Sequence, residues 1–211
     1  MTLGISSGLH HCRIGSDYIF LDAPRDRYFM LSGPPARRFR SFLSDTAIPS
    51  DLEWLVQHKL LAEGGMAASK ATIPEPRSSF AETSKDGWSL ALTTEAVVRQ
   101  RLMERRLKRT ALQAILESAK ATQTYSREGD LETYRSIAHA FRQSRRYVTA
   151  VDKCLARGLA MIQMLGRKRC QAKLVFGVTL PFAAHCWVQW GSHVLTDDLD
   201  VVRPFTPIYV L

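Results

Sequence analysis

The stretch DKCLARGLAMIQML, residues 152–165, combines a reactive residue type with a strongly apolar helical pattern. Its apolar residues recur at helical intervals, so it predicts a buried helix that begins near Asp152-Lys153 and ends at Gly166. Cys154 then falls at the helix start, where unpaired backbone N–H groups and the helix dipole favour an anion. The position therefore stabilises a thiolate, and the same N–H groups could receive the oxyanion of an acyl intermediate.

Three strand-like runs follow this helix, and together they predict a small antiparallel sheet. They cover residues 172–178, 184–190 and 194–196. His185 lies within the second run, where an imidazole is unusual unless it has a buried partner or a chemical role. Asp197 lies just beyond the third run, and an antiparallel return would bring it beside His185. A carboxylate there would orient the imidazole and stabilise its charged form, with Asp198 and Asp200 as rivals.

Each of these residues also has a purely structural interpretation. Cys154 could be a small buried hydrophobe on the apolar face of its helix. His185 could be a satisfied core or surface histidine, and the aspartates could form a surface turn. A cysteine at a helix start, followed downstream by a histidine and an aspartate, favours the catalytic interpretation.

The N-terminal part predicts a different arrangement. Three extended runs bounded by turn residues indicate a β-meander, and they cover Leu9–Ile14, Asp17–Asp22 and Arg27–Leu31. Two helices are expected next, from about Pro35 to Leu43 and over Asp51–Lys59. Ser50 and Glu53 have the spacing of a capping box at the start of the second helix. These elements predict a small winged-helix-like β-β-β-α-α domain over residues 1–66.

A change of composition separates this domain from the rest of the chain. From Gly64 to about Lys85 the residues are mostly Gly, Ala, Ser, Pro and Glu, as in a linker. We therefore expect a linker over residues 67–87 and a second domain over residues 88–211. Residues 94–121 and 131–146 should be helical scaffold. The predicted fold class is α+β, with helices and the small antiparallel sheet in the second domain.

Composition argues against several classes of protein. The chain has 211 residues, of which 45% are hydrophobic, and it lacks both a membrane-length apolar stretch and a signal pattern. We expect a cytoplasmic protein. Four widely spaced cysteines predict neither a disulfide framework nor a metal site. The net charge of +9 lies mostly beyond residue 80, in runs typical of solvated helix faces, so no nucleic-acid partner is expected.

The region from about residue 147 to the C-terminus resembles a known family at several motifs. These are DKCLAR (152–157), FGV (176–178), PFAAHCWV (181–188) and LTD (195–197). Together they resemble the transglutaminase-like leader peptidase of lasso-peptide biosynthesis. The resemblance implies a papain/transglutaminase-like cysteine peptidase domain with Cys154 as nucleophile, His185 as base and Asp197 as the carboxylate that orients it.

The N-terminal β-β-β-α-α segment resembles the PqqD-like element that recognises leader peptides. The resemblance implies that a leader adds as an extra strand to the edge of the small sheet and packs against a helix. The expected contacts come from the third extended run and the second helix. They are Arg27, Tyr28, Phe29, Met30, Leu31, Leu52, Leu55 and Val56.

The two resemblances together imply a function and a set of partners. The chain would bind a lasso precursor peptide and hydrolyse it to remove the leader, without a cofactor of its own. The freed core amine would pass to an asparagine-synthetase-like cyclase, which uses ATP to close a macrolactam. Two alternatives remain, an acyl transferase or transglutaminase with the same triad and a non-catalytic precursor-binding protein.

Three positions depart from the family pattern. Cys186 follows His185 where the family usually has alanine, which adds a second thiol near the site. Gln189 stands where the family often has an acid. No glutamine precedes Cys154 by about six residues, so no side-chain oxyanion donor of the papain kind is visible.

Overall fold

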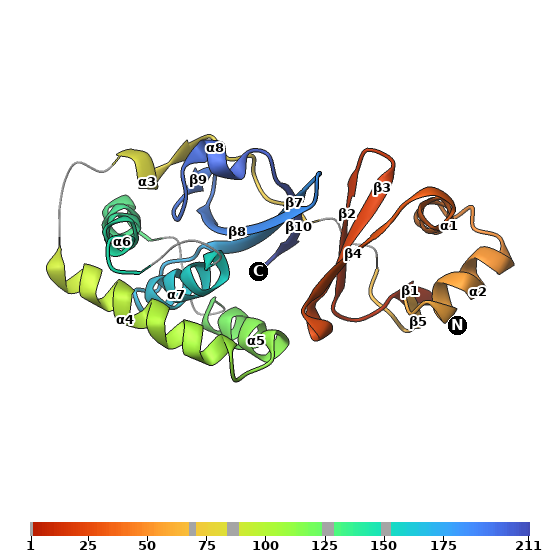
Figure 1. Ribbon diagram of the computed structural model, residues 1–211, viewed down its shortest axis with the longest axis horizontal. Helices are drawn as coiled ribbons and strands as arrows, with labels where there is room; N and C mark the ends of the chain where they lie inside the picture. Colours follow the sequence, from red (N-terminus) through yellow and green to blue (C-terminus); the bar gives the residue numbers. More distant parts are fainter. Residues whose placement is uncertain (1, 68–70, 84–88, 124–128, 149–152) are drawn as a thin grey trace. The chain divides into compact units, whose positions relative to one another are not determined.

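The computed structural model describes residues 2–67, 71–83, 89–123, 129–148 and 153–211. The chain divides into two compact units, Met1–Ala71 and Thr72–Leu211. Figure 1 shows that the first unit holds a meander with two helices, whereas the second holds a larger sheet and most of the helices.

The first unit is built on a three-stranded antiparallel meander. Its strands β2 (Leu9–Ile14), β3 (Asp17–Asp22) and β4 (Arg27–Leu31) have the predicted bounds, and the short helical turn η1 (Ala23–Arg25) links the last two. β3 lies between β2 and β4, so β4 is an outer strand. The predicted β-meander is confirmed.

Two helices cover the meander, α1 (Gly33–Leu43) and α2 (Pro49–Gln57). Phe20, Phe39 and Leu55 are fully buried between these helices and the strands and form the centre of the core. A second sheet, absent from the sequence predictions, pairs β1 (Leu3–Ile5) with β5 (Leu61–Glu63).

The start of α2 differs from the prediction. The expected capping box of Ser50 and Glu53 is wrong, because the helix begins at Pro49 after the N-cap residue Ile48, and no side chain caps it. Proline at the first helical position has a suitable fixed φ and lacks an N–H that would need a partner. The helix therefore starts before the residue expected to cap it.

The second unit contains a five-stranded sheet with the order β10-β7-β8-β9-β6. The strands are β6 (Ser78–Ser79), β7 (Lys173–Thr179), β8 (Ala183–Trp190), β9 (His193–Val194) and β10 (Thr206–Val210). The three predicted runs pair antiparallel as expected, but the sheet as a whole is mixed, because β6 joins it parallel to β9. β6 and β10 come from segments on either side of the predicted strands in sequence, so the local pattern of β7 to β9 does not reveal them.

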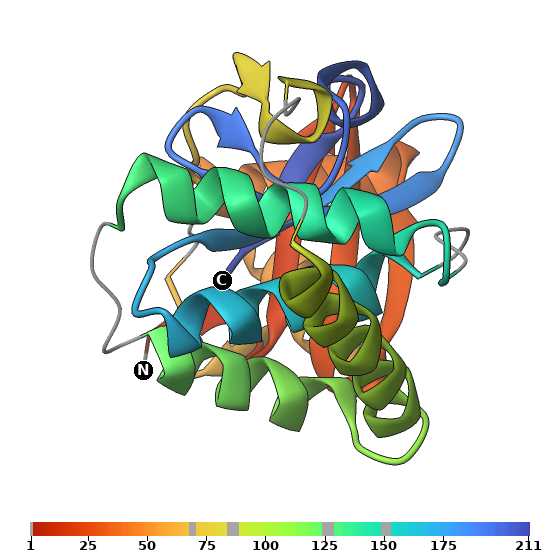
Figure 2. The ribbon, with the colours of Figure 1, turned by 90° about the vertical axis from the view of Figure 1, so that its left-hand side faces the viewer.

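Helices cover this sheet in the second unit. They are α3 (Phe80–Thr83), α4 (Leu90–Leu107), α5 (Leu112–Gln123), α6 (Leu131–Ser144), α7 (Cys154–Arg167) and α8 (Leu199–Val202). α7 packs on β7 and β8, while α4, α5 and α6 pack around α7 (Figure 2). The helical region expected at 94–121 consists of two helices, because α4 ends at Leu107 with Lys108 as its C-cap and α5 begins at Leu112.

Part of the expected linker belongs to the second unit. Ser79, Phe80 and Ala81 are buried there, and the Phe80 ring stacks on His193 with 4.8 Å between ring centroids. These contacts differ from the linker expected over residues 67–87, because the segment adds β6 and α3 to the fold. Residues 68–70 and 84–88 of that linker lie outside the described residues.

Candidate active site

Cys154 is the first residue of α7, and Lys153 is the N-cap residue. Asp152, also expected at this helix start, lies outside the described residues. Lys153 Nζ lies 3.0 Å from Glu104 Oε2, which ties the start of α7 to α4. The helical ladder begins with Arg157 N–H donating to the Lys153 carbonyl, so the N–H groups of the first turn are left without partners inside the helix. They stabilise negative charge at Cys154.

Gly158, one turn after Cys154, lets α7 lie close to the sheet. A Cβ atom at Gly158 would stand 2.6 Å from Leu174 Cδ1 on β7 and 3.9 Å from Cys186 Sγ on β8. A larger residue would force the helix or these side chains to move. The absence of a side chain therefore helps to bring Cys154 to β8.

His185 on β8 and Asp197 beyond β9 lie side by side, with 3.5 Å between Nε2 of the imidazole and Oδ2 of the carboxylate. Two hydrogen bonds hold the loop that carries the aspartate. Ser79 Oγ donates to the Asp197 carbonyl at 2.6 Å, and Val188 N–H donates to Thr196 Oγ1 at 3.0 Å. The return of the chain after β8 thus positions the carboxylate beside the imidazole.

Aromatic side chains surround the His185 ring. The Phe205 ring lies 5.4 Å away and the Trp187 ring 6.4 Å away, measured between centroids. Trp187 is fully buried, and Gly177 makes room for it, because a Cβ there would stand 2.6 Å from Trp187 Cζ3. These walls exclude water from one side of the imidazole and so strengthen its interaction with Asp197.

Gln189, one of the departures from the family pattern, fastens the end of β8. Its Nε2 donates to the carbonyls of Pro74 and Gly191, each at 2.7 Å, and its Oε1 accepts from Trp187 Nε1 at 3.0 Å. A carboxylate could not donate these two bonds. The amide is therefore suited to its place in this chain.

The surroundings favour the charged forms of all three residues, so that Asp197 is negative, His185 positive and Cys154 negative. Burial raises the pKa of Asp197, but its contact with His185 and the charge of Arg157 outweigh it and hold the pKa below its usual value. Burial lowers the pKa of His185, whereas the nearby Asp197 and Cys154 raise it to about 9. A hydrogen bond with Cys186, aided by His185 and opposed by burial, lowers the pKa of Cys154 to about 4. Between these values the site holds a thiolate and an imidazolium.

Cys186 is a buried second thiol beside Cys154. The hydrogen bond with Cys154 and burial raise its pKa well above the usual value, so it stays protonated and donates. The main-chain N–H of Cys186 also helps to stabilise the Cys154 thiolate. On β8, Val188 bonds through its N–H and C=O to Thr196 and Leu195, on the side away from β7. N–H groups two residues apart on a strand face the same edge, so Cys186 N–H also points away from β7.

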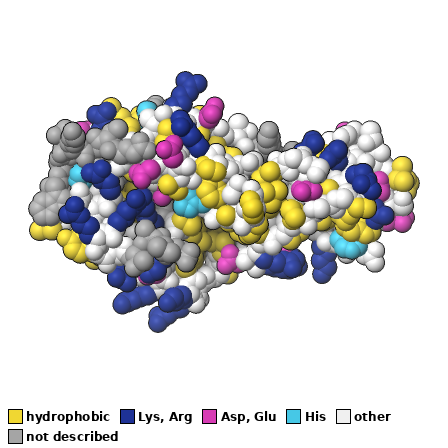
Figure 3. All heavy atoms as spheres, turned by 45° about the horizontal axis from the view of Figure 1, so that its top comes forward, with side chains coloured by type: hydrophobic (Ala, Val, Ile, Leu, Met, Phe, Trp, Pro, Cys, Tyr) yellow, Lys and Arg dark blue, Asp and Glu magenta, His cyan; other side chains and the backbone are white. Residues whose placement is uncertain are grey.

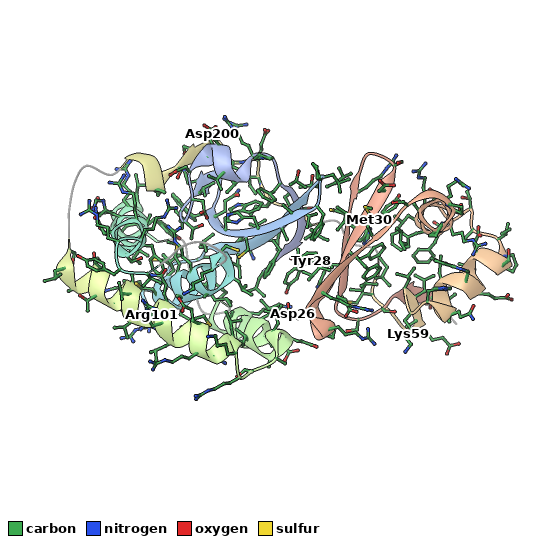
Figure 4. All side chains as sticks on the ribbon, viewed as in Figure 1. Asp26, Tyr28, Met30, Lys59, Arg101 and Asp200 are labelled. Carbon is green, nitrogen blue, oxygen red and sulfur yellow. The ribbon has the colours of Figure 1, made fainter. Side chains whose placement is uncertain are left out.

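Asp197 and its two expected rivals, Asp198 and Asp200, lie in different places. Only Asp197 among them has a described contact with His185. Asp198 is the N-cap residue of α8. The Asp200 side chain is 93% exposed, pairs with Arg203 at 3.4 Å and lies on the outside of α8 (Figure 4). The geometry thus favours Asp197 as the partner of the histidine.

Two arginines that sequence reasoning missed face Asp197 Oδ1, each at 3.6 Å. Arg145, at the C-terminal end of α6, also donates to the Thr196 carbonyl at 2.9 Å. Arg157 lies on α7 and its side chain is only 5% exposed. A signal was present for Arg157, because it interrupts the apolar stretch that predicts α7.

Tyr28 and Met30, two of the expected leader contacts, lie on the outer strand β4 (Figure 4). Ala23 N–H donates to the Gly8 carbonyl and so continues the ladder between β2 and β3. Since bonded pairs alternate along antiparallel strands, the pairs that bond β3 to β4 begin with Asp22. Tyr28 and Met30 therefore direct their N–H and C=O groups to the outer edge of β4, away from β3.

The side chains expected to contact a leader differ in exposure. Met30 is 49% exposed and Val56 42%, whereas Leu52 is partly buried against the core. Leu55 is fully buried, so it holds α2 to the core from inside. A docked peptide could reach the first three but not Leu55.

A pocket of about 430 Å³ opens in the first unit next to β4. Arg27 and Phe29 of β4 line it, and His58 and Lys59, just after α2, border it. The pocket thus lies between β4 and the residues that directly follow α2. Whether a leader binds there stays a prediction.

The parts of the chain that the structure describes contain no group of three or more His, Cys, Asp or Glu side chains that could hold a metal ion. None of their helices is long and apolar enough to cross a membrane. On the face shown in Figure 3, Lys and Arg side chains are scattered among acidic, polar and hydrophobic ones.

Comparison with known proteins gives one match. The model of the transglutaminase-like superfamily matches residues 97–210, which include Cys154, His185 and Asp197. No curated protein and no solved structure matches the chain. The family match covers more than half of the 211 residues and all of the candidate site. The chain therefore belongs to the transglutaminase-like superfamily.

Proposed function

We propose that the protein is a cysteine peptidase that removes the leader from a ribosomally made lasso precursor peptide. The observation that carries this proposal is the set of three residues in the second unit. Cys154 at a helix start, with a pKa of about 4, lies in hydrogen-bonding range of His185, which contacts Asp197. An activated thiolate of this kind performs acyl transfer from peptide bonds.

The proposed reaction has two stages. The Cys154 thiolate attacks the scissile carbonyl, and first-turn N–H groups of α7 stabilise the oxyanion. His185 gives its proton to the leaving amine of the core peptide, so the C–N bond breaks and the leader remains as a thioester. Neutral His185 then takes a proton from water, whose oxygen attacks the thioester and releases the leader acid with the thiolate restored.

The first unit supports leader recognition. Met30 directs its main-chain N–H and C=O to the outer edge of β4, and a bound peptide would pair with them as an added strand. Binding of the leader in the same chain raises the effective concentration of the scissile bond at Cys154. The freed amine would then serve an ATP-dependent, asparagine-synthetase-like cyclase, and we propose a complex with that partner in the cytoplasm.

Replacement of Cys154 by alanine tests the proposal. Cys154→Ala should abolish cleavage of a precursor peptide, followed by mass spectrometry, and leave leader binding, followed by fluorescence anisotropy, within about twofold, because the thiol is needed only for the chemistry. Cys170→Ala is the matched control, since this buried thiol follows the other end of α7. Cleavage by the Cys154→Ala protein would refute the assignment.

Acyl transfer to an amine is a second candidate, because the family that the chain matches is described as transglutaminase-like and the same three residues could serve both reactions. The thioester at Cys154 would then react with an amine instead of water. Incubating the protein and precursor with an added primary amine distinguishes the two. Hydrolysed leader as the main product supports the peptidase, whereas leader amide as the main product supports the transferase.

A further inference from the structure

Arg157 is a charged residue inside the hydrophobic layer between α7 and its neighbours. It lies three residues after Cys154, and its side chain is 5% exposed. Its Nη1 atom lies 3.6 Å from Asp197 Oδ1. Among the described residues, its Nε and Nη2 atoms have no hydrogen-bond partner. A buried guanidinium is costly unless an opposite charge compensates it, and here the compensating charge is Asp197.

The two carboxylate oxygens of Asp197 face different partners. Oδ1 faces the guanidinium groups of Arg145 and Arg157, each at 3.6 Å. Oδ2 faces His185 Nε2 at 3.5 Å. Cations on one oxygen therefore leave the other oxygen directed at the imidazole.

The two arginines are not equivalent. Arg145 is 33% exposed and its Nη2 already donates to the Thr196 carbonyl, so solvent screens its charge. Arg157 has neither solvent nor such a bond. Burial lowers the pKa of Arg157 to about 10, which still leaves it charged at neutral pH.

We propose that Arg157 is a positioning residue that keeps Asp197 ionised and turned toward His185, and that the thiolate of Cys154 depends on it through this chain. The proposal rests on the proposed cysteine chemistry but not on the identity of the substrate. Arg157 acts through Asp197 and does not contact the reacting atoms.

The direction of the effect follows from the charges around Arg157. It faces Asp197 and Asp198 from the loop before α8, Arg145 from α6, and Cys154 on its own helix. Loss of its charge leaves Asp197 buried with less compensation, so the pKa of that carboxyl rises. The weaker negative charge lowers the pKa of His185, and the pKa of Cys154 rises in turn. Glu104 on α4 is engaged by Lys153 and does not replace Asp197.

The test measures the pH dependence of Cys154 alkylation by iodoacetamide in the full chain, with peptide mapping to separate Cys154 from the other thiols. Arg157→Met should move the midpoint upward by at least one pH unit, and Arg157→Lys should restore part of that shift. Arg203→Met, which removes the exposed pair with Asp200, should match the wild type. A folded Arg157→Met protein with an unshifted midpoint overturns the proposal.

A second comparison remains decisive if Arg157→Met does not fold. Asp197→Asn alone is compared with Asp197→Asn combined with Arg157→Met, which removes both buried charges together. Equal midpoints support action through Asp197, and a further shift in the double variant overturns it. A wild-type midpoint near the ordinary thiol pKa of about 8.5 would instead refute the proposed activated thiol, so the two failures are distinct.

Discussion

Asp22 in the first unit and Asp197 in the second each lie beside two arginines, yet the two arrangements differ. Asp22 Oδ2 accepts hydrogen bonds from Arg25 at 3.0 Å and Arg27 at 3.1 Å, and both arginine side chains are more than half exposed. These bonds close the η1 turn between β3 and β4. Asp22 and its two arginines therefore stabilise a turn, and solvent partly screens the attraction between their charges.

Asp197 has longer contacts with its arginines and one of them, Arg157, is buried. The arginines face one oxygen, and the other faces His185. The same residue types thus hold a turn in one unit and set a protonation state in the other. Two features differ. Arg157 is buried whereas both arginines of Asp22 are exposed, and Asp197 has a second oxygen that faces His185.

The strongest test of this comparison replaces each aspartate by asparagine. Asp197→Asn should lower the rate of precursor cleavage by about 10²- to 10⁴-fold, because His185 loses the charge that keeps it protonated. Asp22→Asn should leave alkylation of Cys154 unchanged and lower the free energy of unfolding by about 1 kcal/mol, because only a turn is loosened. Peptide cleavage, alkylation and urea unfolding provide the three measurements. Similar losses of cleavage in both variants would contradict the distinction.

Local sequence patterns predicted the helix that carries Cys154, the strand that carries His185 and the meander of the first unit. Cys154 stands where an apolar helix begins, and His185 stands within a strand bounded by turns. In the first unit the three strands of the meander have the predicted bounds because turn residues separate them. These features depend on neighbours in sequence, which a single sequence displays.

Non-local contacts could not be predicted in this way. β1 pairs with β5 across most of the first unit, and β6 joins a sheet whose other strands come about a hundred residues later. Arg157 interrupts the apolar stretch of its helix, but its partner could not be read from that pattern, because the pairing depends on the loop that carries Asp197. The pairing of Arg145 with the same loop has the same origin. Such contacts require the folded chain.

The pH dependence of cleavage tests the charges that the second unit holds at Cys154 and His185. The value of kcat/KM for cleavage, which reports the free enzyme and the acylation step, should be nearly constant between about pH 4 and 9, the pKa values of Cys154 and His185. Below this range Cys154 becomes a thiol, and above it His185 loses the proton needed by the leaving amine, so the rate should fall about tenfold per pH unit on either side. Alkylation of Cys154 should decline only on the acid side. If alkylation of Cys154 already declined as the pH was lowered below about 8, the thiolate–imidazolium pair of Cys154 and His185 would be contradicted.

The smallest predicted effect concerns the first unit, where main-chain groups rather than charges are expected to act. Met30→Pro removes one N–H that points away from the meander, so the fold should persist while leader binding weakens about 3- to 10-fold, the value of one hydrogen bond. Met30→Leu keeps the N–H and serves as the control. KM for the precursor should rise with little change in kcat, and anisotropy should give the same loss of affinity. Equal affinity of the proline and leucine variants would show that the leader does not add to β4 as a strand at this residue.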